Sequence, residues 1–215
     1  MKKSILTLTL SACLAALAPL SFAAGDASHG ESLAAPCAAC HGPDGNSLAP
    51  TFPKIAGLGE KYLYKQLVDI KSKTRDIVEM TGQLDAMSDQ DLQDLAAYFA
   101  SKPTQLSGAS DQELMLNSGE KVSALKLGEE IYRAGNAATN VPACTGCHSP
   151  RGQGNAPAAY PRLSGQHADY IEKQLLAFKS GARANDGDAR IMRSVAQHMS
   201  EAEIKAVAAY IAGLN

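Results

Sequence analysis

Two short stretches of the sequence share one pattern of two cysteines and a histidine. Cys37-Ala-Ala-Cys40-His41 is repeated as Cys144-Thr-Gly-Cys147-His148, and Cys-x-x-Cys-His is the attachment motif of c-type haem. Two thiols three residues apart lie on one helical turn and can reach both vinyl groups of a porphyrin, while the next residue places an imidazole under the iron. The sequence therefore predicts two covalently bound haem c groups. The predicted attachment points are Cys37, Cys40, Cys144 and Cys147, and the predicted proximal iron ligands are His41 and His148.

A redox disulfide, a structural zinc site and chance are the competing interpretations of these cysteines. A zinc site would need both pairs to meet, although Cys40 and Cys144 are 104 residues apart. A disulfide does not require a histidine at the same place twice. The recurrence of the whole motif in a chain with an export signal favours haem.

The second axial position of each iron separates electron carriers from enzymes. Two methionine pairs recur at an offset of 112 residues, Met80 with Met192 and Met87 with Met199. Met87 and Met199 each precede a serine that begins a capping-box pattern, so each is expected to pack against its own helix as a hydrophobic staple. Met80 and Met192 lie eight residues before that serine, in the segment expected to cross the distal haem face. They are therefore favoured as the axial ligands.

Pro50 and Pro157 each follow their proximal histidine by nine residues. They are either ordinary loop prolines or part of the surroundings of the imidazole, where a nearby backbone carbonyl accepts the Nδ1–H and fixes the tautomer. The matched spacing favours the second interpretation.

The other histidines have no histidine at the matching position of the other copy and are expected to be surface or core residues: His29, His167 and His198.

The haem motifs belong to two copies of one domain. The sequence at 52–57, Phe-Pro-Lys-Ile-Ala-Gly, returns at 160–165 as Tyr-Pro-Arg-Leu-Ser-Gly, and apolar residues with helical spacing follow at the same offset of 108. No alternating apolar run predicts a strand. We therefore predict an all-α fold of two tandem haem domains, at residues 24–107 and 108–215, joined by a segment rich in helix breakers.

Residues 1–23 have the form of a cleavable export signal. Lys2 and Lys3 precede an apolar run and the small-x-small site Ser21-Phe22-Ala23, so Cys13 would be lost with the signal. No later stretch is long and apolar enough to span a bilayer. The mature chain is expected in the periplasm, either soluble or peripherally attached to a membrane. Its 18 Lys+Arg against 22 Asp+Glu argue against nucleic acid as a partner.

Together these features resemble the dihaem cytochromes c4, which consist of two class I cytochrome c domains. The resemblance covers the mature chain and rests on the paired haem motifs and on five strings: Ala-Pro-Thr-Phe-Pro-Lys, Tyr-Leu-Tyr-Lys-Gln-Leu, Glu-Met-Thr-Gly, Asn-Asp-Gly-Asp and Ile-Met-Arg. It implies ligation by His41 with Met80 and by His148 with Met192. It also implies electron transfer from a donor such as a quinol-oxidising complex to an acceptor such as a haem-copper oxidase or a reductase. The segment 113–126 looks longer than is usual in this family.

Three functions suit a dihaem chain of this size. An electron carrier needs nothing beyond the two haems. A dihaem peroxidase needs an open or openable iron, which the two repeated methionines argue against, and this chain looks short for one. The third function is that of a cytochrome subunit of a flavoprotein dehydrogenase, and the sequence distinguishes it poorly from a free electron carrier. Once the cysteines are assigned to haem, the sequence contains no Ser/His/Asp or Cys/His set for other catalysis.

Overall fold

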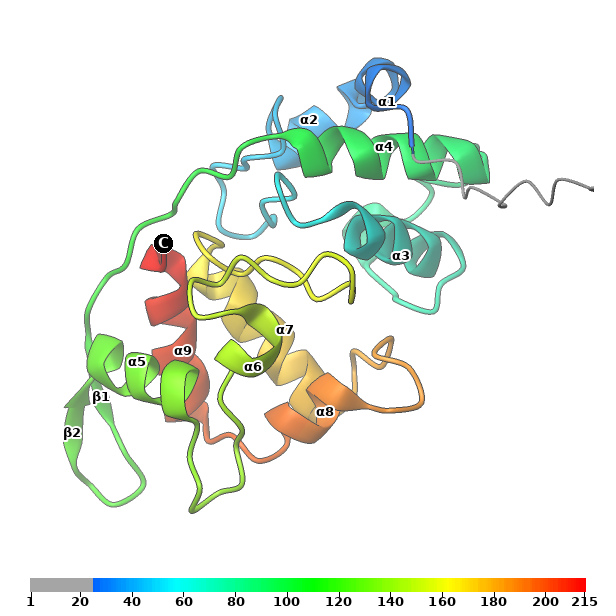
Figure 1. The fold of residues 1–215 in the computed structure, drawn as a ribbon. Helices are drawn as coiled ribbons and strands as arrows, with labels where there is room; N and C mark the ends of the chain where they lie inside the picture. The colour runs from blue at the N-terminus through cyan, green and yellow to red at the C-terminus, as the bar shows by residue number, and fades with distance from the viewer. Residues whose placement is uncertain (1–24) are drawn as a thin grey trace, which may run out of the picture.

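The computed structural model describes residues 25–215 as two helical domains stacked on one another (Figure 1). The predicted export signal and Cys13 lie outside the described residues. The first domain consists of α1 (Ala27–Leu33), the 3-10 helix η1 (Ala35–Cys37), α2 (Ala38–His41), α3 (Glu60–Lys71), the 3-10 helix η2 (Val78–Met80) and α4 (Asp89–Ser101). The second consists of β1 (Glu113–Met115), β2 (Lys121–Ser123), α5 (Ala124–Ala134), α6 (Thr145–His148), α7 (Ala168–Ser180), α8 (Ile191–Ala196) and α9 (Glu201–Gly213). Residues 102–112 connect them without helix or strand.

Each domain is built on the crossing of its first α-helix with its last. In the first domain α1 packs on α4, and in the second α5 packs on α9. A glycine lies at each crossing because no side chain fits there. A Cβ added at Gly30 would lie 2.1 Å from the carbonyl oxygen of Asp94, and one added at Gly128 would lie 2.1 Å from that of Ala206. The two helix backbones therefore touch directly.

The last helix of each domain begins with the predicted capping box. Ser88 and Asp91 exchange backbone and side-chain hydrogen bonds at the start of α4, as Ser200 and Glu203 do at the start of α9. Such a box satisfies two of the backbone N–H groups that a helix leaves unpaired at its start. The prediction from the Ser-x-x-acidic pattern is confirmed in both copies.

Met87 and Met199 pack in the cores, as expected of residues that precede a capping box. Met199 is 1% exposed and lies in one apolar cluster with Ile204, and Met87 packs against the core of the first domain. Their carbonyl groups also accept hydrogen bonds from Lys71 and Lys179, which lie in the last turns of α3 and α7. Both residues are thus held by two kinds of contact with their own domain.

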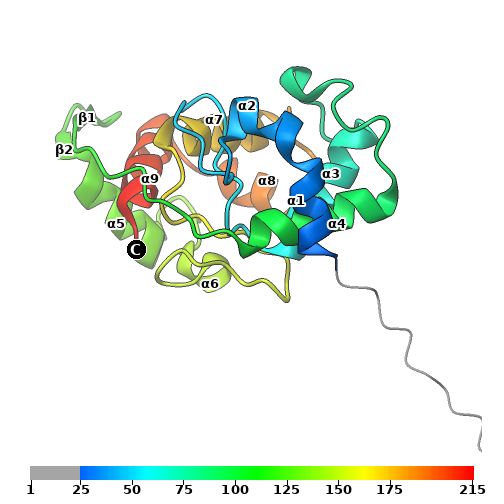
Figure 2. The same ribbon diagram turned by 90° about the horizontal axis from the view of Figure 1, so that it is seen from above.

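A two-stranded hairpin precedes the second domain and departs from the all-helical prediction. β1 and β2 pair antiparallel, with Leu114 opposite Val122. Leu114 is buried in a small cluster with Ala124 and two alanines of α9. The hairpin lies on the opposite side of the molecule from α1 and α4 (Figure 2). Strands of three residues with one buried side chain are too short to show an alternating pattern in the sequence.

The face between the two domains is polar and includes a buried histidine. His167 Nε2 donates to the carbonyl oxygen of Ser47 at 2.9 Å, and its Nδ1 lies 3.0 Å from the hydroxyl of Ser107. Gln166 beside it makes two hydrogen bonds with the backbone of Lys54.

Among the described residues, none of the helices has the length and apolar character needed to cross a membrane.

We predict that Gly30→Ala and Gly128→Ala each destabilise their own domain by about 1–3 kcal/mol, because the new methyl group forces two helix backbones apart. Chemical denaturation followed by helical circular dichroism measures the effect. Gly146→Ala is the matched control, since a Cβ there meets nothing within 4 Å and Ala39 stands at the same position of the first motif. An equal cost for all three substitutions would contradict this account of the crossings.

Candidate haem centres

The two haem motifs fold as short helical turns. Cys37 ends η1 and is followed directly by α2, whose last residue is His41. In the second domain Cys144 immediately precedes α6, which ends at His148. None of the four motif cysteines forms a disulfide in the described part of the chain. The helical turn therefore presents two thiols and an imidazole within five residues, as the motif requires.

Each proximal histidine is held by a backbone carbonyl. His41 Nδ1 lies 2.9 Å from the carbonyl oxygen of Pro53, and His148 Nδ1 lies 3.0 Å from that of Pro161. A carbonyl only accepts, so Nδ1 carries the proton and Nε2 keeps a lone pair for a metal. Burial lowers the pKa of both imidazoles, which outweighs the opposite effect of the carbonyl and keeps the rings neutral. A neutral ring with a free Nε2 is the form that ligates iron.

The prediction that Pro50 and Pro157 contribute to this contact is wrong. Both prolines are exposed, and the carbonyl of Pro157 accepts instead from Lys61 Nζ at 3.3 Å. The acceptor lies three or four residues further along the chain because the loop turns back later than the nine-residue spacing suggests. Ile55 N donates to Gly45 O at 2.7 Å, and Leu163 N donates to Gly152 O at 2.7 Å. These backbone hydrogen bonds bring the loop back to the motif, so that Pro53 and Pro161 lie beside the imidazoles.

A cavity of about 460 Å³ adjoins the first motif. Cys37, Cys40 and His41 line it, together with Met80 from η2; Met87 does not. Much of the remaining lining is apolar and comes from α3 and α4, including Leu63, Leu67, Ile70, Leu95 and Phe99. Two thiols, an imidazole, a thioether and an apolar wall are the groups that a covalently attached porphyrin with two axial ligands requires. The residues present therefore fit haem c.

The corresponding groups of the second domain are arranged in the same order. Met192 lies in the first turn of α8 and packs, half-buried, against the same core cluster as Cys144. Met199 belongs to the interior of that cluster. In both copies, therefore, the earlier methionine of the repeat lies in a short helix and is only partly buried, whereas the later one directly precedes the capped last helix.

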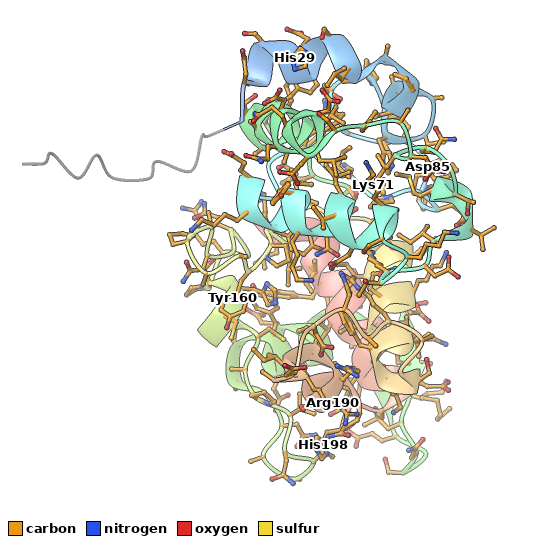
Figure 3. The ribbon with its side chains drawn as sticks, turned by 90° about the vertical axis from the view of Figure 1, so that its right-hand side faces the viewer. His29, Lys71, Asp85, Tyr160, Arg190 and His198 are labelled. Atoms are coloured by element: carbon orange, nitrogen blue, oxygen red, sulfur yellow. The ribbon has the colours of Figure 1, made fainter. Side chains whose placement is uncertain are left out.

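Two arginines that sequence reasoning missed lie where the domains meet, and both line the cavity. Arg75 follows α3 and donates to Tyr170 and Gln174 of the second domain at 2.9 and 3.0 Å. The side of the first domain that faces the second is formed by α3, which carries Lys71 (Figure 3). Arg75 is buried, and its hydrogen-bond partners are a hydroxyl and amides.

Arg183 makes the reciprocal contacts. It follows α7 and donates to Gln66 and Tyr62 of the first domain at 3.0 and 3.3 Å, and to Gln174 of its own domain at 2.8 Å. The signal for both arginines was present in the sequence, because a Tyr-Gln-Arg set recurs at the offset of 108: Tyr62, Gln66 and Arg75, then Tyr170, Gln174 and Arg183. Only the fold shows that each set binds the other.

The two guanidinium groups leave a positive potential beside the cavity. Burial alone would raise the pKa of Tyr62, but Arg183 and Arg75 outweigh it and hold the pKa below its usual value. A haem carries carboxylates at its edge, and a guanidinium is the side chain best suited to bind carboxylate. Arg75 and Arg183 could therefore hold the acidic edge of a haem.

Known proteins match this chain along almost all of its length. The family model described as cytochrome c matches residues 27–102 and 125–215. Cytochrome c4 of Azotobacter vinelandii is 54% identical, over all of both chains. The crystal structure of reduced recombinant cytochrome c4 from Pseudomonas stutzeri superposes with a TM-score of 0.82 at 48% identity, covering 89% of this chain and 100% of that one. A thiosulfate dehydrogenase electron acceptor of Stutzerimonas stutzeri (strain A1501) is 35% identical, over 83% of this chain and 79% of its own length.

The chain therefore belongs to the cytochrome c family and, within it, to the dihaem cytochromes c4. It has two covalently bound haem c groups, one in each domain, and it is an electron-transfer protein rather than an enzyme. The predicted fold class and cofactors are confirmed by these relatives.

We predict that Arg75→Gln and Arg183→Gln each lower the reduction potential of the first haem by roughly tens of millivolts. Oxidation adds a positive charge at the iron, which a guanidinium beside the cavity opposes, so its removal favours the oxidised state. A spectroscopic redox titration measures the shift. Arg151→Gln, an exposed arginine near the second motif, is the control. A shift as large in the control as in the buried variants would be evidence against a role for the interdomain pair.

Proposed function

We propose that the chain carries single electrons in the periplasm, with His41 and Met80 as the axial ligands of the first haem iron and His148 and Met192 as those of the second. When bound, each haem supplies one reversible electron transfer between Fe(III) and Fe(II). The observation that supports this most directly is the cavity beside the first motif, whose lining includes Cys37, Cys40, His41 and Met80. We also propose that residues 24–107 and 108–215 are separate haem-binding units.

The two axial groups suit a carrier because both sides of the iron are then occupied. The imidazole is fixed in one tautomer by a backbone carbonyl, so its orientation does not depend on a mobile side chain. A thioether on the opposite side leaves no position for a substrate. Transfer then requires little rearrangement of the protein.

The predicted export signal supports a periplasmic location, and the donor and acceptor are proposed from the family. A quinol-oxidising complex is the proposed donor, and a haem-copper oxidase or a reductase is the proposed acceptor. The similarity to a thiosulfate dehydrogenase electron acceptor favours a second candidate, in which a dehydrogenase, including a flavoprotein dehydrogenase, reduces this chain directly. Isolation under mild conditions separates the two: dehydrogenase activity, with or without flavin absorbance, travels with the chain only in the second case.

We predict that Met80→Ala and Met192→Ala each remove about half of the sulfur-to-iron charge-transfer band of the oxidised protein, because each deletes one of two thioether ligands. Optical spectra with haem quantitation measure the loss per haem. Met87→Ala is the control, since Met87 packs on the core and does not line the cavity. Loss of the band in Met87→Ala, with the band intact in Met80→Ala, would refute the ligand assignment.

Charge is distributed unequally between the halves of the chain. Residues 24–117 carry 7 Lys+Arg and 13 Asp+Glu, a net charge of −6, whereas residues 118–215 carry 11 and 9, a net charge of +2. Acidic surroundings favour the oxidised iron, so the first haem is expected to have the lower potential. One charge about 15 Å away in water contributes about 0.3 kcal/mol. The difference of eight charges therefore contributes at most about 2 kcal/mol, and salt screens it further.

We predict that the potential of the first haem lies below that of the second by tens of millivolts and that the gap narrows as salt rises. Redox titrations at several ionic strengths measure the gap. Met80→His and Met192→His identify the haems, because a histidine ligand in place of methionine lowers the potential of the haem that it binds. A first haem with the higher potential, or a gap that does not respond to salt, would exclude surface charge as the cause.

A further inference from the structure

The two copies of the repeat differ in length just before the proposed methionine ligand. Arg75 and Arg183 correspond at an offset of 108, but Met80 and Met192 correspond at 112. Four residues separate the arginine from the methionine in the first copy, and eight separate them in the second. The second domain therefore has four additional residues in the segment that leads to its methionine.

Those additional residues bring an aspartate against the first turn of α8. Asp186 Oδ2 accepts a hydrogen bond from the backbone N–H of Arg193 at 2.9 Å, and Oδ1 accepts from Arg193 Nε at 2.6 Å. Arg193 Nη2 also donates to the carbonyl of Gly187 at 3.1 Å. The side chains of Asp186 and Arg193 are only 6% and 20% exposed. Arg193 directly follows Met192, so these three hydrogen bonds fix the backbone on one side of the thioether.

The first domain has no counterpart to this clamp of Asp186 and Arg193. Across residues 76–86, the described side chains make a single charged contact, between Glu79 and Lys173 of the other domain. Its atoms are 3.8 Å apart, and the two side chains are 54% and 64% exposed. An exposed ion pair at that distance stabilises little. Met80 is held mainly by the backbone of a 3-10 turn, in which its N–H donates to Ile77 at 2.9 Å.

We infer that Asp186 and Arg193 are positioning residues for Met192, and that Met80, which lacks such a clamp, is the more easily displaced of the two methionines. The inference rests on the proposed His/Met ligation. A thioether that leaves the iron must move in one of two ways: the backbone turn that carries it shifts, or the methionine side chain rotates about its own bonds. The clamp of Asp186 and Arg193 prevents the shift of the backbone turn, and it does so in the second domain only. An added ligand therefore replaces the methionine of the first haem before that of the second.

Titration of the oxidised holoprotein with imidazole tests this, because imidazole competes with the thioether and removes the sulfur-to-iron charge-transfer band. We expect two steps of about equal amplitude in the unmodified protein. Met80→Ala should eliminate the step at lower imidazole. Asp186→Ala should move the other step to roughly tenfold lower imidazole, since it removes two hydrogen bonds to a charged group, and should leave the first step in place.

Asp188→Ala is the matched control: it removes the same charge two residues away, at an exposed aspartate of the same loop. Arg193→Lys, which keeps the charge but not the forked donor set, should shift the second step part of the way and serves if Asp186→Ala fails to take up its second haem. Haem content and thermal unfolding by circular dichroism identify general destabilisation. The inference is overturned if neither variant shifts the second step beyond the control, or if Met192→Ala eliminates the step at lower imidazole. A full band in Met192→Ala would instead refute the ligand assignment itself.

Discussion

The structure depends on one geometric constraint. An imidazole and two thiols must lie on a single helical turn, and the Nδ1 atom of the imidazole must have a hydrogen-bond acceptor. The turn provides the thiols and the ring, but it cannot supply the acceptor for Nδ1. That acceptor comes from a loop that leaves the motif, turns, and returns to donate two backbone hydrogen bonds to Gly45 or Gly152. The remaining helices close an apolar wall around the space in front of the ring. A domain of about ninety residues has little core of its own, so the haem completes its interior.

Duplication of this unit produces an interface that is polar rather than apolar. Each domain places a tyrosine, a glutamine and an arginine on the face that meets the other, and the arginines exchange partners across it. The amide oxygens of Gln66 and Gln174 are shared between two guanidinium groups. Like charges that share neutral acceptors repel one another, and an anion nearby relieves the repulsion. A carboxylate at the edge of a haem would provide such an anion if it lay beside Arg75 and Arg183.

The local features of the fold could be predicted from the sequence, because they depend on residues close together along the chain. The haem turns, the capping boxes at Ser88 and Ser200, and the packing of Met87 and Met199 follow from spacings of three to five residues. Features that depend on how loops return could not be predicted in the same way. The carbonyl beside His41 is that of Pro53, and the choice of Pro50 was wrong because spacing along a loop does not show where the loop turns back.

Contacts between the two domains were the hardest to foresee. Arg75 and Arg183 were visible as members of the repeat, but nothing in a sequence shows that α3 and α7 face one another. His167 likewise has no counterpart in the first copy, because it makes its contacts at the interface between the two domains, which occurs once in the molecule. The hairpin was missed for a simpler reason, since it buries one residue of β1.

A carrier with two chemically similar haems can pass electrons preferentially in one direction only if its two copies differ. The departures from the repeat therefore carry more functional information than the repeat itself. One departure is the charge of the two halves, which acts through solvent at long range and is weakened by salt. The other is the four-residue insertion that places Asp186 against Arg193, which acts by contact in a largely buried pair and is screened far less. In our proposals the first departure acts on the reduction potentials of the two irons, and the second acts on how firmly each iron keeps its methionine. The two effects therefore differ in their response to salt, which weakens the first and leaves the second largely unchanged.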